Sequence, residues 1–202
     1  MQITNSSPES IKLTLQDNTF QTVDFVMQIE YLVQPLGQVA PYSQRDNRWK
    51  DDLMITSTIG QVGCAMVCCA MLGSQHYTSL TPKTLNDYLR NNSGYTNGNL
   101  IYWSKVSGLI PELQFRDYKK WQNVEADLPH VISELEKHPV ILQVDFRPGG
   151  ALDTHFVLAL RYTDNDIDII DPWDGVQTKL LRRYALADWN LKRAIYAMVV
   201  YD

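Results

Sequence analysis

The sequence predicts an α+β fold, in which helices come first along the chain and a mostly antiparallel sheet follows. Residues 63–138 contain several segments with helical spacing and helix caps, whereas the apolar residues after Pro139 fall in short runs typical of strands. The chain has 202 residues, of which 45% are hydrophobic and 20% charged. These values fit one globular domain with an extension, rather than a disordered or fibrous chain.

Residues 1–38 are predicted to form a separate N-terminal extension. The segment "IKLTLQ" alternates apolar and polar residues, "DN" is a turn signal, and "TVDFVMQIEYLV" is long and apolar. The following "QPLG" is typical of a linker. We therefore expect a β-hairpin-like extension over 1–38 and one larger domain over 39–202.

The predicted helices of the larger domain follow in order. The segment "GCAMVCCAML" has no strand-like alternation and predicts a buried helix with Cys64 near its N-terminus. The segment "TPKTLNDYLRN" begins with a Thr cap followed by Pro, a frequent first residue of helices. A short helix is predicted in "GNLIYWSKVSG", and a longer one in "ADLPHVISELEKH", which Pro139 ends.

Beyond Pro139 the spacing of apolar residues changes to that of strands. Five segments are predicted to be strands: "PVILQVDF", "HFVLALRY", "IDIID", "VQTKLL" and "AIYAMVVY". Because short turns separate several of them, most neighbours in the sheet are expected to be antiparallel.

The charge and the N-terminal sequence argue against several partners. The chain has 18 basic and 23 acidic residues, a net charge of -5, and no cluster of Lys and Arg. Nucleic acid and anionic membranes are therefore poor partners. The first ten residues, "MQITNSSPES", lack the basic and apolar regions of a signal peptide, and no apolar run is long enough to cross a bilayer. We expect a soluble protein, cytoplasmic or released from the cell by lysis or within a particle.

All three cysteines lie within six residues, at Cys64, Cys68 and Cys69. Their odd number and close spacing, without a C-x-x-C pair, argue against a disulfide framework and a structural zinc site. Cys64 in the first turn of a helix would face unpaired backbone N–H groups, which favour a thiolate, and Gly63 would leave the approach to its sulfur open. Cys68 and Cys69 are expected to pack in the core, with a reversible Cys64–Cys68 disulfide as the alternative.

His155 is the candidate base, since it opens a buried strand after the flexible segment "RPGGALDT". A three-residue loop at "TDND" would place Asp171 on the same face of the hairpin as His155, where it could fix the imidazole tautomer. A loop of two or four residues would place the two side chains on opposite faces. Trp173 is expected to shield the His155–Asp171 hydrogen bond from water.

Gln44 is the candidate oxyanion donor. It lies twenty residues before Cys64 in "YSQRDNRW", and its amide could supply an N–H beside the backbone N–H of Cys64. Asp46 and Trp49 are expected to hold this loop in place.

Four segments taken together, "PYSQRDNRW", "STIGQVGCAMV", "TPKTLNDYLRNNSGYTNGNLIYW" and "DTHFVLALRYTDNDIDIIDPWDG", resemble papain-like cysteine peptidases. The resemblance is to the double-glycine (bacteriocin) leader peptidase group, the thirty-ninth family of cysteine peptidases, in its stand-alone form, over about residues 39–202. It implies a papain-like fold in which a helix with the nucleophile packs on a sheet with His and Asp. By this resemblance Gln44 is the oxyanion donor, Cys64 the nucleophile, His155 the base and Asp171 its orienting residue.

The segment after Cys64 departs from the family pattern, because Ala65, Met66 and Val67 replace its usual small residues. A different pocket wall is therefore expected. The resemblance implies an endopeptidase that acts on peptides or proteins, with cell-wall peptides as one candidate, and that needs no cofactor. Two alternatives remain open: acyl transfer to an amine, and an inactive papain-like binding or structural module of a larger assembly. The oligomeric state is also open.

The acidic segment "DNDIDIIDPWDG" resembles a calcium loop, but it lacks the ligand spacing and terminal Glu of an EF-hand. A solvated turn that presents Asp171 explains it better, so no metal site is predicted.

Overall fold

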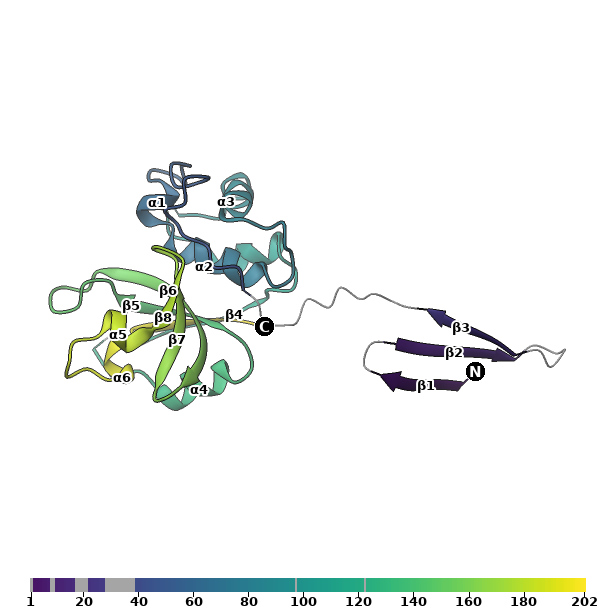
Figure 1. Cartoon of the computed structure of the whole chain (residues 1–202). Helices are drawn as coiled ribbons and strands as arrows, with labels where there is room; N and C mark the ends of the chain where they lie inside the picture. Colours follow the sequence, from purple (N-terminus) through teal and green to yellow (C-terminus); the bar gives the residue numbers. More distant parts are fainter. Residues whose placement is uncertain (1, 8–9, 17–21, 28–38, 97, 122) are drawn as a thin grey trace. The chain divides into compact units, whose positions relative to one another are not determined.

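The computed structural model divides the chain into two compact units, Met1–Gln38 and Val39–Asp202 (Figure 1). It describes residues 2–7, 10–16, 22–27, 39–96, 98–121 and 123–202.

The first unit contains a three-stranded antiparallel sheet in the order β1-β2-β3. Its strands are β1 (Gln2–Ser7), β2 (Ser10–Gln16) and β3 (Thr22–Met27). Strands β2 and β3 form an antiparallel pair, with Gln16 opposite Thr22. Strand β1 was not predicted from the sequence. The predicted turn at 17–18 and the apolar residues 28–33 lie outside the described residues.

The second unit begins with helices and ends with most of its strands. Its helical segments are α1 (Ile59–Val62), α2 (Cys64–Gly73), α3 (Pro82–Asn91), the 3-10 helix η1 (Trp103–Gly108), α4 (Leu128–Leu135), α5 (Leu180–Tyr184) and α6 (Leu191–Ala194). Helix α3 starts as predicted, because the Thr81 side chain accepts a hydrogen bond from the backbone N–H of Thr84 and Pro82 follows the cap.

The sheet of this unit has six strands in the order β4-β9-β5-β6-β7-β8, and all neighbours are antiparallel. The strands are β4 (Phe115–Lys120), β5 (Val140–Asp145), β6 (Thr154–Thr163), β7 (Asp166–Asp171), β8 (Val176–Lys179) and β9 (Ala197–Tyr201). The predicted α+β class, helices with an antiparallel sheet, is confirmed.

Apolar side chains on the two faces of the sheet belong to two separate cores. One core joins α2 and α3 to alternate strand residues such as Ile141 and Leu158. The other joins α4, α5 and α6 to the intervening residues, such as Leu142 and Val157. Helices therefore cover both faces, and α2, which carries Cys64, is buried along most of its length (Figure 1). No helix among the described residues is long and apolar enough to cross a membrane.

The β6–β7 hairpin shows the length of the loop at "TDND", which the sequence left open. Asp164 and Asn165 form a two-residue turn with φ of 56° and 60°, and Thr163 pairs with Asp166. That turn alone would place His155 and Asp171 on opposite faces. A β-bulge between Ala159 and Arg161 adds one residue to β6 and reverses this outcome, because Leu158 then pairs with Ile170. His155 consequently shares a face with Asp171, diagonally across the pair.

Candidate active site

Cys64 is half-buried and is the first residue of α2, directly after the short helix α1. Gly63 joins the two helices. A Cβ atom at this position would lie 2.5 Å from the carbonyl oxygen of Ile59. The close approach of α1 therefore gives a steric reason for Gly at this position, separate from the expected access to the sulfur.

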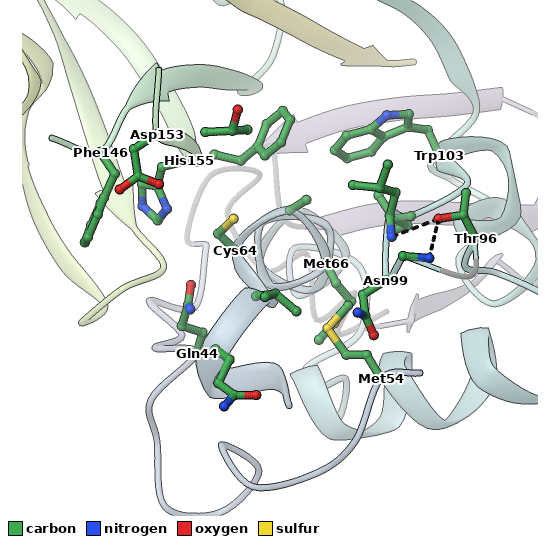
Figure 2. Close-up of a pocket in the computed structure, with 18 of the residues that line it drawn as sticks. Gln44, Met54, Cys64, Met66, Thr96, Asn99, Trp103, Phe146, Asp153 and His155 are labelled. Carbon is green, nitrogen blue, oxygen red and sulfur yellow. Dashed lines mark hydrogen bonds between the residues drawn. The ribbon is translucent and has the colours of Figure 1, made fainter. Parts of the chain in front are cut away.

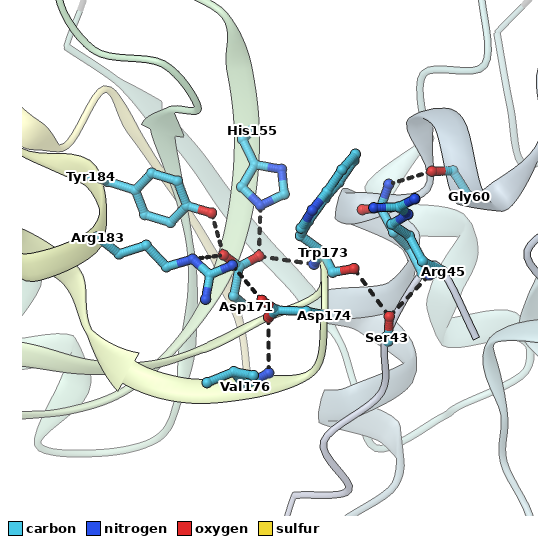
Figure 3. Close-up of polar contacts among 11 residues, drawn as sticks. Ser43, Arg45, Gly60, His155, Asp171, Trp173, Asp174, Val176, Arg183 and Tyr184 are labelled. Carbon is cyan, nitrogen blue, oxygen red and sulfur yellow. Dashed lines mark hydrogen bonds and ion pairs between the residues drawn. The ribbon is translucent and has the colours of Figure 1, made fainter.

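His155 is the second residue of β6 and only 4% of its surface is exposed. Its Nε2 lies 2.8 Å from Oδ1 of Asp171 (Figure 3). Burial alone would lower the pKa of His155, but hydrogen bonds with Asp171 and Cys64, together with their negative charges, raise it to about 9. Since Nε2 faces Asp171, Nδ1 is the nitrogen left for Cys64.

Asp171 ends β7 and is fully buried. Its Oδ1 accepts hydrogen bonds from His155 and from the backbone N–H of Trp173 at 2.9 Å, while Oδ2 accepts from the Tyr184 hydroxyl and lies 2.6 Å from Nε of Arg183. Burial works to raise the pKa of Asp171, but the bonds from His155, Tyr184 and Trp173 outweigh it and lower the pKa. The buried carboxylate is thus ionised and well supplied with donors.

Aromatic rings surround the imidazole. Phe146 and Tyr184 lie 4.9 Å and 5.6 Å from the His155 ring, measured between centroids. Trp173, which was expected to shield the His155–Asp171 hydrogen bond from water, packs on Phe146 with 4.9 Å between the ring centroids. Phe146 and Tyr184 were not predicted from the sequence. Together with Trp173 they form an apolar surround for the His155–Asp171 hydrogen bond.

Gln44 lies beside the helix junction and is 2% exposed. Its backbone N–H donates to the Pro172 carbonyl at 2.5 Å, and its Nε2 donates to the Gly60 carbonyl at 3.1 Å. An amide nitrogen carries two hydrogens, and the Gly60 bond uses one of them. Trp49 supports the loop as expected, because its Nε1 donates to the Ser43 carbonyl at 2.8 Å.

A cleft of about 730 Å³ brings Gln44, Cys64 and His155 together. Figure 2 shows Cys64 between two walls, with Phe146, Asp153 and His155 on one side and Met54, Thr96, Asn99 and Trp103 on the other. Three apolar side chains of the lining are exposed: Val62 (42%), Leu100 (68%) and Tyr102 (49%). Exposed apolar groups gathered at a cleft are typical of a binding surface.

Asn99 stabilises the wall opposite His155. Its Oδ1 accepts hydrogen bonds from the backbone N–H groups of Ile55, Thr56 and Ser57, and its Nδ2 donates to Thr56 Oγ1 at 2.8 Å. Asn99 has a φ of 64°, which Asn tolerates better than most residues. This side chain therefore ties two loops of the cleft wall together.

Cys68 and Cys69 are fully buried, and all three cysteines are free thiols. Burial raises the pKa of Cys68 well above its usual value and that of Cys69 to about 12. The Cys69 sulfur lies 3.6 Å from the Tyr201 hydroxyl. Both residues occupy the core between α2 and the sheet, as expected from the sequence.

Four of the five carboxylates of the acidic segment, those of Asp164, Asp168, Asp171 and Asp174, have basic partners. Asp168 lies 2.7 Å from Arg161 Nε and 3.0 Å from Lys179 Nζ, and Asp174 lies 2.7 Å from Arg183. Within the described part of the chain, no three His, Cys, Asp or Glu side chains gather as a metal site would require.

Comparisons with known proteins place this chain in a family. Neither the curated proteins nor the solved structures contain a match to this chain. A family model described as "Peptidase_C39 like family" matches residues 36–198. This match spans most of the chain and nearly the whole second unit. The chain therefore belongs to the Peptidase_C39 like family, a family of peptidases.

Proposed function

We propose that this protein is a cysteine endopeptidase, with Cys64 as nucleophile, His155 as acid and base, Asp171 as orienting residue and Gln44 as oxyanion donor. The observation that carries the proposal is geometric: Cys64 and His155 line the same cleft as Gln44, and His155 Nε2 lies 2.8 Å from Oδ1 of the fully buried Asp171. This arrangement has the roles of a catalytic triad and opens onto a cleft.

The proposed cycle begins from an ion pair of the Cys64 thiolate and the His155 imidazolium, with the thiol proton already on Nδ1 of His155. The thiolate attacks the peptide carbonyl carbon, and the backbone N–H of Cys64 and Nε2 of Gln44 stabilise the oxyanion. His155 protonates the leaving amine as the C–N bond breaks, which leaves a thioester on Cys64. Water, deprotonated by His155, then attacks the thioester, and the product acid leaves as the sulfur is released.

The position of His155 indicates how the peptide substrate is oriented in the cleft. Because His155 protonates the leaving amine, the C-terminal product lies on the wall of Phe146 and Asp153. The acyl part of the substrate then lies against the opposite wall, where Leu100 and Tyr102 are exposed. We infer a peptide substrate with a large apolar side chain on the N-terminal side of the cleaved bond.

Intact-mass labelling with iodoacetamide near neutral pH tests the proposal on wild type, Cys64→Ala and His155→Ala. We expect one fast adduct in the wild type, none in folded Cys64→Ala and much slower labelling in His155→Ala. Labelling that is slow and indifferent to His155 would contradict the proposal and favour the alternative of an inactive binding module.

The substrate is then sought with a library of fluorogenic peptides that differ at the residues flanking the cleaved bond. Adding a small primary amine separates hydrolysis from acyl transfer. A product joined to the amine, at the expense of the free acid, would identify the protein as an acyl-transfer enzyme instead of a hydrolase.

A further inference from the structure

The turn at 171–175, between β7 and β8, contacts both halves of the proposed active site. At its start, Asp171 accepts a hydrogen bond from His155. The next carbonyl, that of Pro172, accepts the backbone N–H of Gln44 at 2.5 Å. One short turn thus holds the proposed base and the proposed oxyanion donor at the same time.

The turn also packs closely on the loop that carries Gln44. The Trp173 carbonyl accepts a hydrogen bond from Ser43 Oγ at 3.1 Å, and the Arg45 guanidinium lies 4.7 Å from the Trp173 ring centroid. Gly175 has a φ of 75°, and a Cβ atom there would lie 3.0 Å from the Pro41 carbonyl oxygen. With this packing, a displacement of the turn would displace Gln44 as well.

Arg183 of α5 forms ion pairs with two carboxylates of this turn. Its Nε lies 2.6 Å from Oδ2 of Asp171, and its Nη2 lies 2.7 Å from Oδ2 of Asp174 (Figure 3). Asp174 Oδ1 in turn accepts the backbone N–H of Val176 at 3.1 Å. A single guanidinium therefore bridges two carboxylates of the turn, an arrangement that suits the fixed fork of Arg.

We propose that Arg183 is a positioning residue that couples the His155–Asp171 pair to Gln44 through the turn at 171–175. Arg183 is not among the described residues that line the cleft, so it acts through the turn and not on the substrate. This inference rests on the proposed function. It adds that both halves of the active site depend on one ion-pair bridge outside the cleft.

Two reactions of Cys64 separate the two halves. Alkylation by iodoacetamide displaces iodide and creates no oxyanion, so its rate reports the Cys64–His155 pair. Acylation by 4-nitrophenyl acetate creates an oxyanion, so its rate reports Gln44 in addition. The ratio of the acylation rate to the alkylation rate therefore isolates the oxyanion donor.

We expect Arg183→Gln to lower this ratio by about 10-fold, since small misplacements of a catalytic group have large effects on rate. Gln44→Ala removes the proposed oxyanion donor, so the ratio in this variant gives the largest decrease that a displacement of Gln44 could cause. In Gln44→Ala combined with Arg183→Gln the ratio should fall no further than in Gln44→Ala alone, because the first change has already removed the group that the second displaces.

Three further variants act as controls. Arg182→Gln removes an exposed Arg of the same helix and should leave the ratio unchanged. Arg183→Lys keeps a cation near Asp171 but cannot bridge both carboxylates. The ratio in this variant should therefore be about as low as in Arg183→Gln. Asp174→Asn keeps an acceptor for Val176 but loses the ion pair, so the ratio should fall by a smaller factor even if Arg183→Gln does not fold.

The outcomes distinguish the inference from the proposed function. An unchanged ratio in Arg183→Gln and Asp174→Asn, with wild-type alkylation still fast and dependent on His155, overturns the role of Arg183 and leaves the peptidase proposal standing. Wild-type alkylation that is slow and independent of His155 overturns both. A low ratio in Arg182→Gln would also reject the inference, because it would show that the ratio depends on the net positive charge of α5 and not on the ion pairs of Arg183.

Discussion

His155 lies between two groups that stabilise its protonated form. Hydrogen bonds with Asp171 and Cys64 raise its pKa to about 9 against the effect of burial, so the imidazolium predominates below that pH and is lost above it. The imidazolium protonates the leaving amine in the proposed cycle. We therefore expect kcat/KM for peptide hydrolysis to fall as the pH rises through about 9.

Asp171→Asn tests this assignment, because it removes a negative charge while keeping a side chain of the same shape. The pKa of His155 should fall, and the alkaline limb of the kcat/KM profile should move to lower pH. We also expect kcat to fall by about 10- to 100-fold, since the imidazole loses its orienting partner. An alkaline limb at the same pH in both proteins would show that a group other than His155 controls it.

The other two cysteines are predicted to be unreactive in the folded protein. Cys68 and Cys69 are fully buried, and burial raises the pKa of both thiols, so neither solvent access nor a thiolate is available. Folded Cys64→Ala should take up no iodoacetamide over the period in which the wild type is fully labelled. In guanidinium chloride the same variant should take up two adducts.

A related measurement concerns the disulfide alternative. After mild peroxide treatment and digestion without reductant, we expect no Cys64–Cys68 linkage, because Cys68 is a poor nucleophile in its buried site. A linked peptide that appears reversibly would instead make Cys68 a resolving cysteine.

At the scale of single elements, the β6–β7 hairpin shows where prediction from sequence ends. The alternation of apolar residues locates both strands, and a two-residue turn at Asp164 and Asn165 agrees with the tolerance of these residues for positive φ. The bulge at Leu160 has no comparable signal, since Leu160 is apolar like its neighbours. The face shared by His155 and Asp171 therefore depends on a feature that local sequence does not reveal.

Other elements were missed for similar physical reasons. Strand β4, "FRDYKK", exposes most of its side chains and has no apolar run. The predicted strand "VQTKLL" ends at Lys179, because α5 begins at Leu180. The candidate residues Gln44, Cys64 and His155 could be chosen from residue type and order. Arg183 could not, because its partners come from another element and only the folded chain brings them together.

The loop opposite His155 provides a prediction about substrate binding. Leu100 is 68% exposed and lines the cleft, so Leu100→Ser should weaken binding of a peptide with an apolar side chain and should hardly affect chemistry. We expect KM to rise about 10-fold with kcat within about twofold of the wild type. Val124→Ser is the matched control, since Val124 is 66% exposed and lies outside the cleft lining. Equal KM values in Leu100→Ser and wild type would place the acyl part of the substrate elsewhere.

At the scale of the whole molecule, the family match and the division of the chain nearly coincide. The match covers residues 36–198, and the second compact unit is Val39–Asp202. The six-stranded sheet, both cores described above and all residues of the proposed active site lie within this unit. The fragment 36–202 therefore contains every described element of the second unit.

We predict that the fragment 36–202 folds by itself and keeps the reactivity of Cys64. Its thermal unfolding midpoint should lie within about 5 °C of that of the full chain, because the described core would lose no member. The rate of iodoacetamide alkylation should agree within about twofold. Loss of folding would mean that residues 1–35 complete the domain. Alkylation faster by about 10-fold would mean that they restrict access to Cys64, and faster peptide cleavage by the fragment would then make the extension an inhibitory segment.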